Sequence, residues 1–86
     1  NYPNPYKNNT TIPLHLVHPA DVRLDLYNLE GKLVASIQKD GLIAAQHDLF
    51  VDMDQLGLPV GNYVYQIEVN NANGIFKDCK LMTAAK

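Results

Sequence analysis

Residues 57–69, which read GLPVGNYVYQIEV, decide the fold of this chain. Large side chains recur at every second position of its second half, a spacing that places them on one face of a β-strand. These side chains are Tyr63, Tyr65, Ile67 and Val69. Aromatic and β-branched residues suit a half-buried pleated surface, so the stretch predicts a central core strand.

The residues just before this strand predict a tight corner that is held by a side-chain hydrogen bond. Two glycines and a proline close a turn, and Leu58 and Pro59 stand a few positions ahead of Tyr63. The arrangement is typical of the tyrosine corner of immunoglobulin-like sandwiches, in which a phenol hydroxyl bonds back to upstream backbone. An ordinary hairpin strand without a corner is the alternative.

The same alternation of apolar and polar residues recurs along the chain. It predicts strands over residues 10–17, 21–26, 32–39, 46–52, 61–69 and 75–83. Turn signals separate them at regular spacing and no stretch has a convincing helical period. Six or seven short strands of this kind predict an all-β fold, an immunoglobulin-like two-sheet antiparallel β-sandwich.

Glycine, asparagine and proline mark the connections between these strands. Residues 28–31 offer a glycine for a positive φ and are expected to close a hairpin. Asp40 and Gly41 predict a second turn, and residues 70–74 predict a loop before a last strand that pairs back on 61–69. Pro13 cannot donate to a ladder, so its strand is expected at a sheet edge or with an interruption.

The totals place this chain among small folded domains. Its 86 residues make one domain, and 47% hydrophobic with 19% charged residues is too apolar for a disordered tail. Pro3 and Pro5 push their neighbours into extended conformations, so residues 1–9 are expected to form an extended lead-in. Residues 10–86 would then form the single sandwich domain.

Charge and cysteine content exclude several classes of function. A net charge of −2 with scattered cations provides no basic stripe that could bind nucleic acid. No apolar run reaches the roughly 20 residues that span a bilayer, so direct membrane insertion is not expected. The single cysteine excludes an internal disulfide and a cysteine-based zinc site. The chain starts at Asn1 without a methionine, so we expect a piece of a longer protein.

Candidate catalytic and metal-binding residues are few. Asp52 and Asp54 match an acidic calcium loop only in part, because its third acid and closing glutamate are missing. Cys79 has no activating partner in the sequence, so we expect a small buried hydrophobe. Three histidines are expected to be ordinary surface or boundary residues: His15, His18 and His47. We therefore expect no metal, no cofactor and no enzymatic activity.

Four stretches together point to one family. The chain opens with YPNP at 2–5, continues with VRLDLYNLEGKLV at 22–34 and LPVGNYVYQIEV at 58–69, and ends with Lys80-Leu81-Met82 and Lys86. In this order and spacing they resemble the C-terminal sorting domain of proteins exported by the bacterial type IX secretion system. The final residues, TAAK, depart from the β-branched run that the family more often has before its lysine.

The resemblance implies a non-catalytic secretion signal. Such a domain ends a cargo protein that folds in the periplasm and is then recognised by the outer-membrane translocon. A cell-surface sortase commonly removes the domain and attaches the cargo to an anionic lipopolysaccharide. The expected location is therefore secreted or cell-surface. A structural or adhesive immunoglobulin-like module that binds protein or glycan is the alternative.

The resemblance also implies roles for individual residues, as recognition or motif positions. Pro3, Asn4 and Pro5 set the lead-in, Gly31 sets the hairpin turn, Pro59, Gly61 and Tyr63 set the corner, and Lys80 and Lys86 mark the terminal strand. The last strand and the lead-in are the expected recognition surface, because a strand edge offers unpaired backbone groups to a partner. Such an edge also leaves an edge-strand dimer open, and Pro13 argues against pairing along the first strand.

Overall fold

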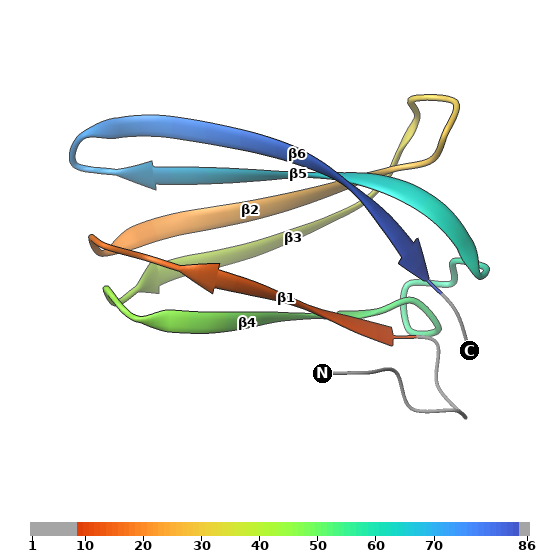
Figure 1. Cartoon of the computed structure of the whole chain (residues 1–86), viewed down its shortest axis with the longest axis horizontal. Coiled ribbons are helices and arrows are strands. Elements are labelled where there is room, and N and C mark those ends of the chain that lie inside the picture. The colour runs from red at the N-terminus through yellow and green to blue at the C-terminus, as the bar shows by residue number, and fades with distance from the viewer. Residues whose placement is uncertain (1–8, 85–86) are drawn as a thin grey trace.

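The strands of this protein pack as two antiparallel sheets in a computed structural model that describes residues 9–84 (Figure 1). Over that range the chain forms six strands and no helix. They are β1 (Asn9–His15), β2 (Ala20–Tyr27), β3 (Leu33–Leu42), β4 (Gln46–Asp52), β5 (Gly61–Asn71) and β6 (Gly74–Ala84). The predicted all-β, immunoglobulin-like two-sheet antiparallel sandwich is confirmed.

The two sheets differ in width. The larger has four strands in the order β3-β2-β5-β6, and the smaller has only β1 and β4. Figure 1 shows β1 and β4 side by side at the bottom of the view, with β2 and β3 of the larger sheet above them and β5 and β6 at the top. β5 lies between β2 and β6, so the predicted central core strand is confirmed.

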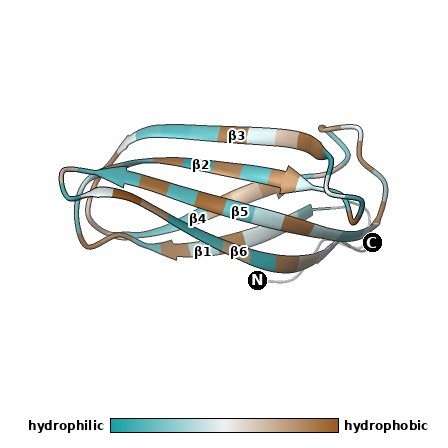
Figure 2. Ribbon diagram, turned by 90° about the horizontal axis from the view of Figure 1, so that it is seen from above, coloured by the Kyte–Doolittle hydropathy of each residue, from teal (hydrophilic) through white to brown (hydrophobic). Residues whose placement is uncertain are grey.

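The core fills the space between the sheets because apolar residues alternate along each strand. Figure 2 shows this alternation plainly along β5. The buried apolar residues are Ile12, Leu16, Ala20, Val22, Leu24, Leu26, Leu49, Val51, Met53, Tyr63 and Met82. Fully burying one large apolar side chain contributes about 1.5–3 kcal/mol to the stability of the fold. The buried side chains on the inner face of β2 therefore contribute strongly to holding the two sheets together.

The β2–β3 hairpin forms where the sequence predicts it. Asn28 closes the turn, since its Oδ1 accepts hydrogen bonds from the backbone N–H groups of Glu30 and Lys32, both at 3.0 Å. Gly31 adopts a φ of 85°, which an L side chain rarely tolerates. The turn at 28–31 and the hairpin are therefore confirmed.

The turn predicted at Asp40 and Gly41 is wrong, because both residues lie inside β3. The two of them stand opposite the single residue Asp21 of β2, which makes a β-bulge. Gly41 has a φ of 66°, and its N–H donates to Asp21 Oδ1 at 2.8 Å. A positive-φ glycine serves a bulge as well as a turn, and the chain reverses instead at residues 43–45.

The β5–β6 pair is long and regular. Its register runs without a shift from Gly61 opposite Ala84 to Asn71 opposite Gly74. Only Ala72 and Asn73 separate the two strands, so the predicted loop at 70–74 is shorter than expected. The last strand pairs back on β5 as predicted, and it forms one edge of the larger sheet.

Candidate recognition surface

The predicted tyrosine corner is present at the start of β5. The Tyr63 hydroxyl donates a hydrogen bond of 2.6 Å to the backbone carbonyl oxygen of Pro59, four residues upstream. The Tyr63 ring is buried, and Gly61 is the first residue of β5. The corner therefore fixes where β5 begins.

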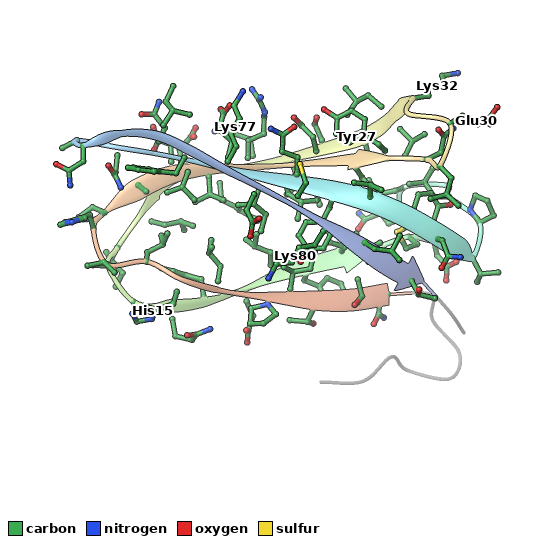
Figure 3. All side chains as sticks on the ribbon, turned by 45° about the horizontal axis from the view of Figure 1, so that its top comes forward. His15, Tyr27, Glu30, Lys32, Lys77 and Lys80 are labelled. Carbon is green, nitrogen blue, oxygen red and sulfur yellow. The ribbon has the colours of Figure 1, made fainter. Side chains whose placement is uncertain are left out.

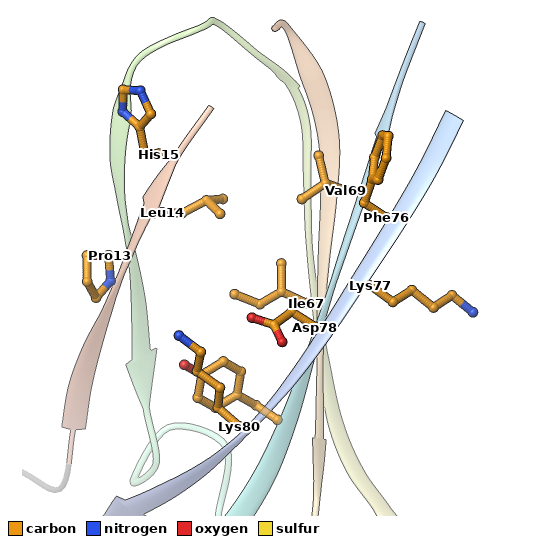
Figure 4. A pocket seen from close by; sticks show the side chains of 10 residues that line it. Pro13, Leu14, His15, Ile67, Val69, Phe76, Lys77, Asp78 and Lys80 are labelled. Carbon is orange, nitrogen blue, oxygen red and sulfur yellow. The ribbon is translucent and has the colours of Figure 1, made fainter. Parts of the chain in front are cut away.

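The sandwich is open on the side where β1 faces β5 and β6. Within residues 9–84, β1 pairs only with β4 and β6 pairs only with β5, so each has an edge without a neighbour. Between them lies an open groove of about 230 Å³ (Figure 4). Its apolar lining residues are Leu14, Tyr65, Ile67, Val69 and Phe76. Part of the apolar interior is therefore accessible from outside, between the edge strands β1 and β6.

Charged residues rim this groove. Asp78 and Lys80 extend from β6 toward it, His15 stands across from them on β1, and Lys77 points away (Figure 4). Among the described residues neither Asp78 nor Lys80 makes an ion pair, whereas Lys77 Nζ lies 3.6 Å from Glu68 Oε1. β6 therefore contributes one acid and one base to the rim of the groove, beside its apolar floor.

A second polar cluster lies on the outer face of the larger sheet. Arg23 contacts both Asp25 and Glu68, with nitrogen-oxygen distances of 3.2 and 3.4 Å. The Ser36 hydroxyl donates to the other oxygen of Asp25 at 2.5 Å. Asp25 is only 7% exposed, so these contacts compensate for its desolvation. The local sequence did not indicate this burial, because it depends on Ser36, which belongs to the neighbouring strand β3.

The expected recognition residues fall in separate elements. Gly31 lies in the β2–β3 turn, Pro59, Gly61 and Tyr63 form the corner, and Lys80 faces the groove. Figure 3 shows Lys80 on the side of the larger sheet that faces β1, with Lys77 and Tyr27 on the opposite side. Pro3, Asn4, Pro5 and Lys86 lie outside the described residues. Only Lys80 joins the groove, and the sequence did not predict the groove itself.

The expectation that Cys79 is buried is wrong, because its thiol is exposed. β6 alternates between two faces, and its inner positions include Asp78, Lys80 and the buried Met82. Cys79 therefore lies on the outer face, in line with Lys77 and the exposed Leu81.

The other candidate residues do not gather into a chemical site. No group of three or more metal-binding side chains occurs in the part of the chain that the structure describes. His47 Nε2 lies 2.7 Å from the backbone oxygen of Ile43, and Asp52 Oδ1 accepts a hydrogen bond of 3.2 Å from the Gln55 N–H. Asp52 thus stabilises the turn after β4. The described residues also contain no helix long and apolar enough to cross a membrane.

A family model described as a secretion system C-terminal sorting domain matches residues 1–78. The match covers the YPNP opening, the β2–β3 hairpin and the corner, and it ends at Asp78 within β6. The chain matches no curated protein and no solved structure.

Proposed function

Because the chain belongs to the family of C-terminal sorting domains of the type IX secretion system, we propose that the folded sandwich is read by an outer-membrane translocon and then by a cell-surface sortase. Membership makes the chain a sorting signal for a secreted or cell-surface cargo, in a family that is generally non-catalytic. Passage through the periplasm, removal of the domain and attachment of the cargo to the surface belong to the proposal.

The observation that carries this proposal is the free edge of β6 beside the groove. A strand edge binds a partner through backbone hydrogen bonds, and pockets for alternate side chains add specificity. The groove supplies such a pocket, lined by Leu14, Ile67 and Phe76 among others. Asp78 and Lys80 at its rim would select the partner's charge pattern and register.

The remaining motif residues take two kinds of role in this proposal. Gly31, Pro59, Gly61 and Tyr63 hold the turn and the corner, so they act on recognition through the fold. Pro3, Asn4, Pro5 and Lys86 are assigned to recognition on the family resemblance. The division into a lead-in at 1–9 and a sandwich at 10–86 stays a prediction, although residue 9 already belongs to β1.

A transplant experiment tests the sorting function. Residues 1–86 are fused behind a periplasm-directed fluorescent protein in a host with a working type IX system, and surface fluorescence is measured. We expect the reporter on the surface, and in the periplasm when the translocon is disabled. Reporter that stays in the periplasm with the domain folded would overturn the proposal and favour a structural or adhesive module.

A matched pair of lysine variants tests the β6 edge. Lys80 and Lys39 are both exposed and stand on the two opposite edge strands of the larger sheet. Lys80→Glu should lower surface delivery several-fold, and Lys39→Glu should leave it unchanged. Equal delivery by the two variants, both shown to be folded, would remove β6 as the recognition surface without touching the sorting function.

A further inference from the structure

Of the two edge strands that have neither a proline nor a register shift, β4 has only seven residues and β6 is the longer. It has eleven residues, contains no proline, and pairs with β5 without a register shift. The other edge of its sheet, β3, carries two register shifts against β2, and β1 carries Pro13. Bulges and prolines discourage pairing with another chain, whereas a long regular edge is a template for a further strand.

The sequence of β6 is self-complementary about its midpoint. The central residue of the span from Gly74 to Ala84 is Cys79. We propose that β6 pairs antiparallel with β6 of a second copy of this chain, centred on Cys79. All eleven residues then find a partner, and Asp78 of each copy stands opposite Lys80 of the other.

Charge selects this register over its neighbours. Moving the centre by one residue would place Asp78 opposite Asp78, or Lys80 opposite Lys80. Opposite charges directly across a ladder are stabilising and like charges are destabilising. Inward-pointing charges on an edge also discourage ordinary apolar strands. Pairing with the β6 edge is therefore unfavourable for most strands. It is favourable for a strand that carries an acid and a base two residues apart, and β6 is such a strand.

The backbone is compatible with this pairing. In a two-residue hairpin the flanking residues, here Asn71 and Gly74, form a hydrogen-bonded pair, and such pairs recur at every second residue. Gly74 and the even-numbered residues of β6 thus bond to β5, and odd-numbered residues turn their N–H and C=O groups outward. A centre at Cys79 joins odd residues to odd residues, as a continuous ladder requires.

The dimer goes beyond the proposed sorting function, because it rests on β6 alone. It joins two four-stranded sheets into one and covers the edge that a translocon would otherwise bind. Self-pairing would therefore protect β6 from non-specific strand addition until the machinery displaces the second copy. Dimer formation needs no secretion system and is measured on the isolated domain. A failure to dimerise can therefore be distinguished from a failure of sorting.

Charge reversal tests the register. The reduced domain is examined by sedimentation equilibrium over a range of concentrations, with folding checked by circular dichroism. We expect a mass twice the 9.6 kDa of one chain for the native sequence. Asp78→Lys and Lys80→Asp should each stay monomeric, and the double variant should dimerise again. A monomeric native chain, or single variants that dimerise as well as the native chain, would overturn the proposal.

Cross-linking at Cys79 tests the centre of the dimer independently of charge. Residues opposite each other in a hydrogen-bonded pair have Cα atoms about 5.5 Å apart, within the range that a disulfide bridges. With oxidised glutathione, two Cys79 thiols should form one disulfide, while the oxidant is reduced to two glutathione thiols. Rapid formation of a covalent dimer is the expected result.

A displaced cysteine is the matched control. In Cys79→Ser/Leu81→Cys the new thiol stays on the exposed outer face of β6. The two copies of residue 81 would lie about 13 Å apart along the strands, since a strand rises about 3.3 Å per residue. This variant should cross-link at least ten times more slowly. Equal rates for the two cysteine positions would contradict a dimer centred on Cys79.

Discussion

The two edges of the four-stranded sheet differ in how they are protected. β3 is broken by register shifts near both ends, and at one of them Gly41 is held by the Asp21 carboxylate. β6 is unbroken and presents large apolar side chains to solvent, with Leu81 68% exposed. Backbone irregularity discourages a further strand from pairing with β3. On β6 only the charges of Asp78 and Lys80 discourage such pairing. The difference leaves β6 as the edge of this sheet that can accept a further strand.

The two edge strands also differ in what anchors them to the core. β6 reaches the core through Met82, which stands opposite Tyr63 of the corner, and both side chains are buried. β3 contacts the core through side chains that are only partly buried, such as Ile37. The β6 side of the sheet should therefore depend on the corner, and the β3 side should depend on many smaller contacts.

The largest expected effect tests this dependence on the corner. Tyr63→Ala should lower the free energy of unfolding by about 3–5 kcal/mol, because it removes a buried ring beside Met82. Ile37→Ala, on the β3 side, should cost about 1–2 kcal/mol, since its side chain is only half-buried. Denaturation by urea measures both values. Equal losses would show that the corner does not anchor the β6 side.

A smaller effect sharpens the description of β6 as an edge. Lys80→Pro should cost about 1–3 kcal/mol, because the Lys80 N–H is expected to bond to β5 and its removal leaves an acceptor unpaired. Cys79→Pro should cost less than about 1 kcal/mol, since that N–H faces the free edge. Urea denaturation under dilute conditions, where the chain is monomeric, compares them. The reverse order would mean that the ladder has the opposite alternation.

The smallest effect concerns the bulge that closes β3. Gly41→Ala should cost about 1 kcal/mol, because an L side chain is strained at a φ of 66°. No atom beyond Gly41 and its two chain neighbours lies within 4 Å of the added Cβ, so the cost would come from the backbone conformation. Lys39→Ala, at an exposed position of the same strand, is the control and should change stability little. A neutral Gly41→Ala would argue that the bulge is not strained in this way.

Much of the fold followed from local patterns. The alternation at Val22, Leu24 and Leu26 predicted a strand with one buried face, and all three are at most 1% exposed. The spacing from Pro59 to Tyr63 predicted the corner, because a tyrosine hydroxyl four residues on can reach back to that carbonyl. These predictions succeeded because the alternation can be read within one strand and the corner hydrogen bond lies within one turn.

The predictions that failed required knowledge of neighbouring strands. Asp40 and Gly41 carry a turn signal, but they form a β-bulge in β3 where this strand pairs with β2. Cys79 was expected inside because cysteine is often buried, but the register of β6 turns it outward. The alternation along β2 does not show that Asp25 is buried, because this burial depends on Ser36 of β3.

The sequence by itself determined the β-strands, the corner at Tyr63 and the family to which the chain belongs, because each depends on the order and spacing of nearby residues. Only the tertiary structure decided which strands lie at the edges. A two-stranded sheet facing a four-stranded one leaves the groove beside β1 open and brings Asp78 and Lys80 to its rim. These features depend on contacts between residues far apart in the chain, which the alternation within a strand does not specify.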